Sequence, residues 1–196
     1  MDSSLFEWIN RFADRTDWAH GPMRFYADYG IVLFAGLLLF GLLRSRHRND
    51  LRGVGGAIWA GAAALVALGI GQLIGNAVNR ARPYETLANV HVLIGRTTDF
   101  SFPSDHATAV GAVAVGLLLV DRRLGLLAGV ASLLMAFTRV YVGAHYPLDV
   151  LAGLLLGGTI AFVGARLVLP ILERVLRRVA ASPVGIVVTA ASTSPG

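Results

Sequence analysis

Five long apolar segments constrain the structure of this chain more than any other feature of its sequence. They span about residues 25–43, 54–78, 106–120, 124–141 and 148–169, with polar or arginine-rich stretches between them. A helix that crosses a bilayer needs about 20 predominantly apolar residues. Charged residues make up 15% of the 196 residues, against about a quarter in soluble domains. We therefore expect an all-α fold, a polytopic membrane helix bundle with about five transmembrane helices.

The residues before the first apolar segment form a candidate amphipathic helix over about residues 3–15. Leu5, Trp8, Ile9 and Phe12 recur there at helical spacing, so either the membrane surface or the protein's own loops would cover that face. The start is acidic and lacks an apolar run before a cleavage site, which is not typical of a signal peptide. We expect one membrane-embedded domain over residues 1–178 and a C-terminal tail over residues 179–196 that is disordered at its end.

The distribution of arginine predicts the orientation of the bundle. All 17 basic residues are arginines, and with five spans three arginine-containing stretches fall on one side of the membrane. These stretches hold Arg44, Arg46, Arg48 and Arg52, then Arg122 and Arg123, then Arg174, Arg177 and Arg178. Cytoplasmic loops carry an excess of arginine and lysine, so we expect the N-terminus and the connections at 79–104 and 142–147 to face the exterior.

Three polar clusters lie in or beside those outer connections. They are "NRARPYE" at 79–85, "PSDH" at 103–106 and "TRVYVGAHYPLD" at 138–149. Polar and ionisable groups close to hydrocarbon are costly, so they usually mark functional sites. Three such clusters on one face of the membrane predict a single site.

The residue types in these clusters suit phosphate chemistry. Arg82 and Arg139 would supply guanidinium forks that match phosphate oxygens. His106 and His145 would supply a proton donor and a nucleophile near neutral pH. Asp149 follows His145 by four residues, and it would orient the imidazole ring if the turn between them is helical.

Two predicted helix starts add anion-binding capacity to the same clusters. Ser104 follows Pro103 and reads as the cap of the third apolar segment, with His106 in its first turn. Pro147 suits the first turn of the last segment. Helix N-termini bind phosphate through free N–H groups, so we expect both to point into one external pocket.

Composition excludes several other classes of site. The chain has no cysteine, so it has no disulfide, no thiolate metal site and no cysteine nucleophile. Its arginines are scattered between apolar runs, so we expect no nucleic-acid partner. Glu85 and Asp99 read as solvated loop residues, although a cation that bridges a diphosphate could use them.

At these motifs the chain resembles the type-2 phosphatidic-acid phosphatase superfamily. The resemblance covers about residues 50–170 and rests on Arg82-Pro83, on "PSDH" and on the segment from Thr138 to Asp149. With Asp105 in the second motif, "FPSDHAT" is similar to the bacitracin-resistance-type undecaprenyl pyrophosphate phosphatases. The resemblance implies a multi-pass protein of the bacterial inner (plasma) membrane that forms a phosphohistidine intermediate and needs no metal or other cofactor.

The roles implied by the resemblance follow position by position. His145 would be the nucleophile, Asp149 its orienting partner, and His106 the proton donor to the leaving group. Phosphate oxygens would be bound by Arg82, Ser104 and Arg139, with Asp105 beside them. The implied substrate is a polyprenyl diphosphate lipid among the membrane lipids.

Two positions depart from the pattern of the superfamily. A lysine often stands seven residues before the first-motif arginine, and that position is Gly75 here. Asn79 lies four residues further on the same predicted helical face and would donate one hydrogen bond. Arg80 either replaces the lost charge or serves as a topology anchor. Thr138 stands where serine is usual and keeps the hydroxyl group.

These residues suggest three functions and exclude a fourth. The leading one is hydrolysis of undecaprenyl diphosphate at the outer face, which would recycle the lipid carrier of cell-wall synthesis and confer bacitracin resistance. The second keeps the chemistry but takes phosphatidate or phosphatidylglycerol phosphate. The third is a lipid-phosphate carrier or flippase, which needs the arginines but not both histidines. A soluble vanadate-haloperoxidase-like enzyme is excluded by the hydropathy.

Overall fold

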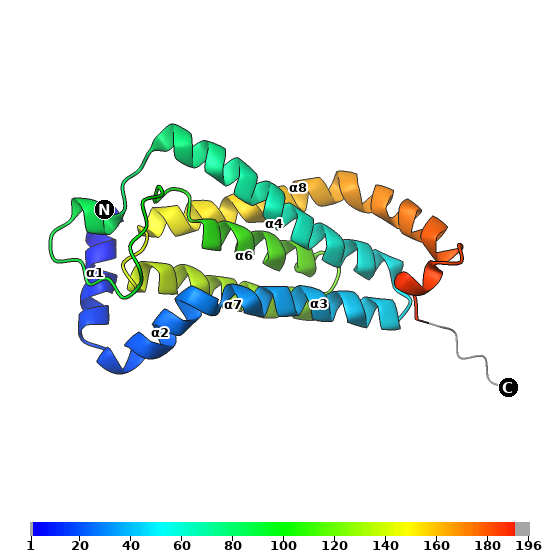
Figure 1. Ribbon diagram of the computed structural model, residues 1–196, viewed down its shortest axis with the longest axis horizontal. Coiled ribbons are helices and arrows are strands. Elements are labelled where there is room, and N and C mark those ends of the chain that lie inside the picture. The colour runs from blue at the N-terminus through cyan, green and yellow to red at the C-terminus, as the bar shows by residue number, and fades with distance from the viewer. Residues whose placement is uncertain (1, 191–196) are drawn as a thin grey trace.

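Within residues 2–190, which the computed structural model describes, every regular element is helical (Figure 1). The helices are α1 (Asp2–Asp14), α2 (Asp17–Tyr29), α3 (Ile31–His47), α4 (Leu51–Val78), α5 (Pro83–Thr86), α6 (Asp105–Leu118), α7 (Arg122–Tyr141), α8 (Pro147–Ala180) and the 3₁₀ helix η1 (Gly185–Val187). The predicted all-α class is confirmed.

The helices that could cross a membrane account for most of the predicted spans. Three segments, at α4, α7 and α8, are long and apolar enough, and α2 with α3 adds a fourth if this pair, bent by 54°, forms one span. Helix α6 is apolar but has only 14 residues, which at 1.5 Å per residue is about 21 Å. The hydrocarbon core is about 30 Å thick, so the count of five spans stays a prediction.

Helix α6 lies in the middle of the bundle, between α4, α7 and α8 (Figure 1). Most of its residues are small or β-branched, and most are buried. Glycines allow α8 to approach it closely: a Cβ atom at Gly153 would lie 2.7 Å from the Ser104 carbonyl oxygen, and one at Gly157 would lie 2.0 Å from that of Thr108. The polar start of α6 is therefore surrounded by protein rather than by lipid.

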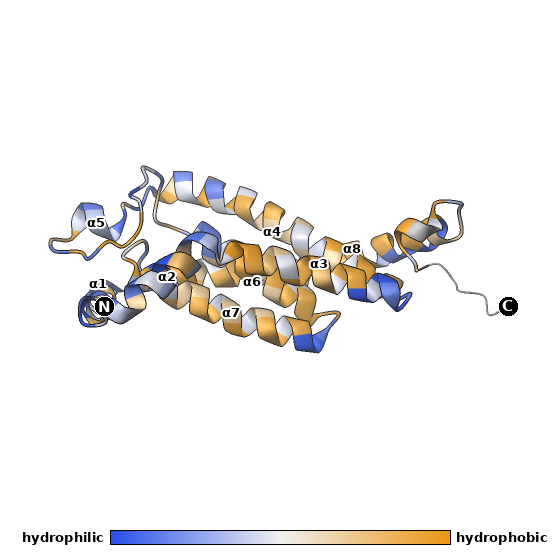
Figure 2. Cartoon of the chain, turned by 60° about the horizontal axis from the view of Figure 1, so that its bottom comes forward, coloured by the Kyte–Doolittle hydropathy of each residue, from blue (hydrophilic) through white to orange (hydrophobic). Residues whose placement is uncertain are grey.

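The two ends of the bundle are polar and its middle is apolar (Figure 2). At one end, Asp50 accepts a hydrogen bond from the backbone of Gly53 and caps α4, while Asp121 accepts from Arg123 and Leu124 and caps α7. This end contains the predicted cytoplasmic arginines. All three polar clusters lie at the opposite end, as the sequence predicts.

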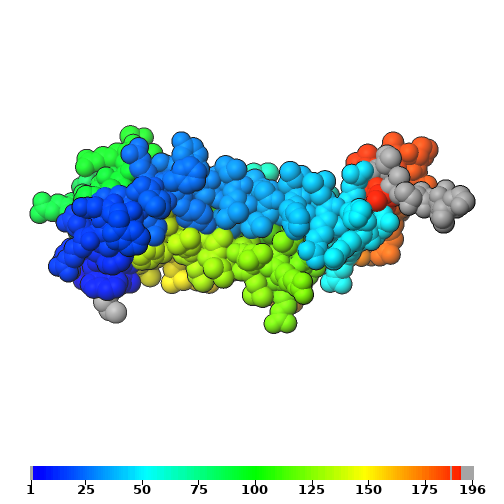
Figure 3. Space-filling model, turned by 90° about the horizontal axis from the view of Figure 1, so that it is seen from below, coloured from blue at the N-terminus to red at the C-terminus, as the bar shows by residue number. Residues whose placement is uncertain are grey.

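Helix α1 packs across the end that holds the polar clusters (Figures 1 and 3). It buries a stripe made of Phe6, Asn10 and Ala13 against the protein. Leu5, Trp8 and Phe12, from the apolar set that the sequence singled out, stay about half exposed or more. A helix is present where one was predicted, and placement of its exposed face on the membrane surface stays a prediction.

Helix α8 differs from its predicted extent. The last apolar segment was expected to end at Leu169, before Pro170, yet the helix continues to Ala180. A proline within a helix removes one backbone hydrogen bond, and burial of Leu169 and Leu176 on either side offsets that loss. The domain boundary at residue 178 stays a prediction. Val188 packs against Val54 and Leu176, and the end of the tail, residues 191–196, lies outside the described residues.

Candidate active site

A cavity of about 130 Å³ lies where the polar clusters meet. It is lined by Arg82, Ile94, Gly95, Thr97, Asp99, Phe100, Asp105, His106, Arg139 and His145. The chain brings these residues together because α6 starts, α7 ends and the connections before α6 and α8 run at the same end of the bundle (Figure 1). The structure thus places both predicted histidines and two of the three predicted phosphate-binding arginines, Arg82 and Arg139, around one space.

His145 is buried and held in one tautomer by the backbone. Its Nδ1 atom lies 2.8 Å from the carbonyl oxygen of Ser101, and a carbonyl can only accept, so Nδ1 carries the proton. Nε2 is then the unprotonated nitrogen, 3.3 Å from Nη1 of Arg82. Burial, with the nearby charges of Arg139 and Arg82, holds the pKa of His145 well below its ordinary value. The ring is neutral at neutral pH, and its Nε2 lone pair accepts a hydrogen bond from Nη1 of Arg82.

Asp149 does not contact His145, which corrects the predicted direct pair. Its carboxylate accepts from Ser101 Oγ at 2.5 Å, from the Tyr146 backbone N–H at 2.9 Å and from Arg80 Nη1 at 2.6 Å. The reason is that α8 begins at Pro147, so His145 lies outside the helix and the four-residue helical spacing does not apply. Ser101 stands between the two residues, bonding Asp149 through its hydroxyl and His145 through its carbonyl.

The guanidinium of Arg82 is fixed by several acceptors. Nη1 donates to the carbonyl oxygen of Ala144 at 3.0 Å, and Nε donates to that of Asp99 at 3.2 Å. Nη2 forms a 2.9 Å ion pair with the Asp99 carboxylate. An incoming phosphate would therefore meet an arginine that already lies beside His145 and carries a carboxylate partner.

Asp99 lines this cavity, although the sequence analysis interpreted it as a solvated loop residue. Its side chain is 55% exposed. Partial burial works to raise its pKa, but the Thr97 hydroxyl and the Arg82 charge outweigh burial and lower the pKa below its ordinary value. Asp99 is thus ionised at neutral pH and occupies one side of the Arg82 fork.

Two buried polar atoms at the site have no hydrogen-bond partner among residues 2–190. They are Nε of Arg139 and Oγ of Ser104. Buried polar groups are nearly always paired in folded proteins, so these two are suited to a ligand with hydrogen-bonding oxygens. Ser104 occupies the N-cap position of α6 as predicted, but its side chain makes no capping bond, which leaves the hydroxyl free.

The N-terminus of α8 is occupied, so the expectation of two open helix N-termini is half right. The Leu148 backbone N–H donates to Oδ1 of Asp2 at 3.0 Å, and Asp149 accepts from Tyr146. Carboxylates at a helix N-terminus satisfy the amides that have no partner within the helix. Among the described residues of this site, the start of α6 has no side-chain cap.

Arg80 and Asn79 lie outside the cavity, and their predicted part in phosphate binding is not supported by their positions. Arg80 forms ion pairs with Asp2 and Asp149 and stacks 4.1 Å over the Tyr146 ring. Asn79 is exposed and ends α4 in the left-handed conformation, with φ of 52°. Because the helix stops at Val78, helical spacing no longer places Asn79 on the face of Gly75.

A second cavity, of about 150 Å³, adjoins the first and contains the predicted lysine position. Gly75 lines it together with Gln72, and Asp99 and Asp105 border both cavities. Gln72 donates to Oδ2 of Asp105 at 2.8 Å. Asp105 therefore faces the site from the start of α6, held by an amide from α4 rather than by an arginine.

Ser101 and Asp2 are the site residues that the sequence reasoning missed. Ser101 lies in the same stretch as the "PSDH" motif, but a lone serine in a loop carries no signal of its own. Its bond to Asp149 joins residues 48 apart. Asp2 reaches Leu148 across 146 positions, and nothing in its local sequence indicates that contact.

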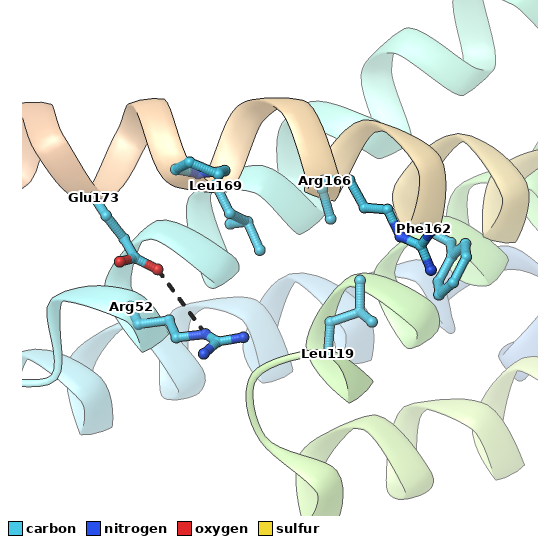
Figure 4. Close-up of a pocket in the computed structure, with 8 residues that line it drawn as sticks. Arg52, Leu119, Phe162, Arg166, Leu169 and Glu173 are labelled. Atoms are coloured by element: carbon cyan, nitrogen blue, oxygen red, sulfur yellow. Dashed lines mark ion pairs between the residues drawn. The ribbon is translucent and has the colours of Figure 1, made fainter.

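A larger cavity, of about 350 Å³, lies at the opposite end between α4, α6 and α8. Figure 4 shows Arg52 paired with Glu173 at 3.9 Å, while Arg166 stacks on Phe162 at 4.6 Å. Its lining contains no histidine and no hydroxyl group. Its one carboxylate, that of Glu173, is paired with Arg52, and the lining offers no imidazole, so size alone does not make it the reactive site.

Comparison with known proteins agrees with the geometry. A family model described as the PAP2 superfamily matches residues 56–171. The undecaprenyl-diphosphatase BcrC of Bacillus subtilis is 32% identical over 184 residues, which is 90% of this chain and 91% of the relative. The bacitracin transport permease protein BcrC of Bacillus licheniformis is 33% identical over 80% of this chain and 75% of its own length. The crystal structure of Aquifex aeolicus LpxE superposes with a TM-score of 0.64, at 24% identity, over 83% of this chain and 93% of that one.

Proposed function

The chain belongs to the PAP2 superfamily, and we propose that it hydrolyses undecaprenyl diphosphate to undecaprenyl phosphate and inorganic phosphate. The observation that carries the proposal is the neutral, tautomer-fixed imidazole of His145 in one cavity with Arg82, Arg139 and His106. Transfer of a phosphoryl group to water needs a nucleophile, neutralisation of the phosphate charge and protonation of the leaving oxygen. These four side chains are suited to supply all three.

The proposed reaction uses these groups in two steps. Nε2 of His145 attacks the terminal phosphorus, and the bond from that phosphorus to the bridging oxygen breaks. His106, in its imidazolium form, gives a proton to the bridging oxygen; lipid monophosphate leaves, and His106 is left neutral. His106 then takes a proton from water as that water attacks the phosphohistidine, which releases phosphate and restores Nε2.

Charge on the phosphoryl oxygens is met by groups already in place. The guanidinium of Arg82 lies beside Nε2 of His145, and Arg139 contributes a buried Nε atom that lacks a partner among the described residues. Ser104 adds a buried hydroxyl group. Donors fixed before the reaction stabilise developing charge without reorganisation. We expect no metal ion to be required.

The choice of lipid rests on the relatives. The relative matched along nearly its full length is named an undecaprenyl-diphosphatase, which favours a polyprenyl diphosphate over the alternatives phosphatidate and phosphatidylglycerol phosphate. A carrier function also has a relative with a matching name, a transport permease. A carrier has no need of an imidazole held in one tautomer, and this arrangement favours hydrolysis.

The site is proposed to face the exterior of the bacterial plasma membrane. The cavity lies at the end of the bundle opposite the arginine-rich turns, which the positive-inside rule places in the cytoplasm. A phosphatase at the outer face would act on the lipid carrier after its cargo has been transferred.

Phosphate release by the purified protein in detergent tests the function. Polyprenyl diphosphate, phosphatidate and phosphatidylglycerol phosphate would be compared with and without a metal chelator, with His145→Ala as the control variant. We expect release from the polyprenyl diphosphate, unaffected by the chelator and absent in the variant. Faster release from a glycerophospholipid would reassign the substrate, and no release from any of the three would favour the carrier.

A further inference from the structure

A continuous set of polar contacts joins the first helix to the nucleophile. Asp2 pairs with Nη2 of Arg80, and Nη1 of Arg80 donates to Oδ1 of Asp149 at 2.6 Å. Asp149 accepts from Ser101 Oγ at 2.5 Å, and the Ser101 carbonyl accepts from His145 Nδ1 at 2.8 Å. Every link is an ion pair or a hydrogen bond of ordinary or short length.

Arg80 is held from three sides in this set. Asp2 and Asp149 lie on two nitrogens of its guanidinium, and the Tyr146 ring lies 4.1 Å beneath it. The Asp149 side chain is fully buried, whereas those of Asp2 and Arg80 are 14% and 27% exposed. A buried carboxylate needs a well-placed cation, so the position of Arg80 determines how Asp149 is held.

Asp2 touches two parts of the site at once. One carboxylate oxygen pairs with Arg80, and the other accepts from the backbone N–H of Leu148 in the first turn of α8. The same helix inserts Phe6, which is 1% exposed, against Tyr146 with ring centroids 5.5 Å apart. Helix α1 is thus attached to Leu148, which directly precedes Asp149, and to Tyr146, which directly follows His145.

We propose that Asp2 is a positioning residue for the nucleophile, so that α1 is part of the catalytic apparatus. This inference rests on the proposed function of the site. Asp2 fixes the guanidinium of Arg80, Arg80 fixes Asp149, and Asp149 fixes Ser101, whose carbonyl sets the tautomer and direction of the His145 ring. Without the Asp2 carboxylate, Arg80 loses one of its two anionic partners and the ring is less well aligned for attack.

Kinetics of matched variants test the inference. Asp2→Asn removes one charge from α1, and Glu7→Gln makes the same kind of change on the same helix, at an exposed residue paired with Arg11 at 3.8 Å. A small misplacement of a reacting group can cost about a hundredfold in rate. We expect Asp2→Asn to lower kcat about ten- to a hundredfold with KM nearly unchanged, Glu7→Gln to have no effect, and Asp2→Glu to recover part of the loss.

A double-variant comparison tests the path through Ser101. Residues in one hydrogen-bonded network have non-additive effects. In a Ser101→Ala background, Asp2→Asn should therefore lower kcat less than twofold further. Equal loss in both backgrounds, or a rise in KM without a fall in kcat, would overturn the positioning role.

A spectroscopic readout separates this inference from the proposed function. Nitrogen NMR of labelled histidine, with His145→Gln to assign the signal, reports which ring nitrogen of His145 carries the proton. We expect a single Nδ1–H tautomer in the parent protein and in Glu7→Gln, and a mixture in Asp2→Asn. An unchanged tautomer in Asp2→Asn would overturn the inference even if the parent protein is active. A mixture together with no phosphate release from any lipid would show that Asp2 sets the tautomer of His145, and it would reject the proposed function and with it the catalytic role of α1.

Discussion

The Nδ1 atom of His145 lies 2.8 Å from the carbonyl oxygen of Ser101, and this contact fixes which nitrogen of the ring can react. A carbonyl accepts but cannot donate, so the proton stays on Nδ1 at neutral pH. Nε2, beside Arg82, is the nitrogen that remains to attack phosphorus.

The first prediction concerns this nucleophile. His145→Ala should reduce turnover to background because it removes the Nε2 atom that lies 3.3 Å from Nη1 of Arg82. Brief incubation with labelled polyprenyl diphosphate, quenched without acid, should leave label on the parent protein only. Near-normal turnover in the variant would show that another group attacks phosphorus.

The second prediction separates the two arginines of the first motif. Arg82→Ala removes a guanidinium from the cavity, and charge-assisted bonds are worth about 1.5–3 kcal/mol, or about ten- to a hundredfold. Inhibition by inorganic phosphate should weaken by that factor. Arg80→Ala should leave phosphate inhibition unchanged and lower kcat, since Arg80 contacts Asp149 rather than the cavity. Weaker phosphate inhibition in Arg80→Ala would restore its predicted role in phosphate binding.

The third prediction concerns the missing lysine. Gly75 lines the adjoining cavity, and a Cβ atom there would lie 3.1 Å from the carbonyl oxygen of Phe102. Gly75→Lys should therefore not rescue Arg80→Ala, because Gly75 lines this cavity whereas Arg80 is held outside it by Asp2 and Asp149. Initial rates of the single and double variants provide the measurement, and recovery of the parent rate would place both residues at one phosphate subsite.

The fourth prediction concerns Asp99, which competes with phosphate for Arg82. An ion pair of this exposure is worth about 0.5–1 kcal/mol, so Asp99→Asn should tighten inhibition by inorganic phosphate about two- to fivefold. Glu85→Gln, in the same outer connection, serves as a comparison. Weaker inhibition in Asp99→Asn would mean that the carboxylate helps to hold the anion instead.

The fifth prediction concerns pH and stability. The folded-state pKa of His145 lies well below its ordinary value, which is about 6.5 in the unfolded chain. Between those two values the unfolded state binds more protons, so stability rises with pH and is lost as the pH falls below about 6.5. The slope from one such group is at most about 1.4 kcal/mol per pH unit. His145→Gln should flatten the dependence of Tm on pH between 5 and 7; an equal slope in both proteins would assign it to other groups.

The sixth prediction concerns sidedness. The chain has no cysteine, so single cysteines at the exposed positions Ala88 and His47 can be labelled separately. In intact cells a membrane-impermeant thiol reagent should label Ala88→Cys and not His47→Cys. The reverse pattern would place the cavity on the cytoplasmic side.

Much of the site was predictable, because its location depends on the local composition of the chain and on the number of helices that cross the membrane. Apolar length predicts where helices lie, and a chain that crosses back and forth returns its alternate connections to the same end. The residues Arg82, His106, Arg139 and His145 were therefore expected together, and they line one cavity.

The sequence could not determine the hydrogen-bond partners of the site residues. These partners depend on the residue at which each helix begins and on which of several nearby donors binds each acceptor. Asp149 stands four residues after His145, but α8 starts at Pro147, so its carboxylate binds Tyr146, Ser101 and Arg80 instead. The partners Ser101 and Arg80 lie 48 and 69 positions away along the chain. Contacts of this kind form only when the packed helices bring distant loops together. Hydropathy and motif spacing do not indicate which donors then reach the Asp149 carboxylate. The apolar pattern determined the bundle and the end at which the site lies, while tertiary packing decided which residue orients the nucleophile.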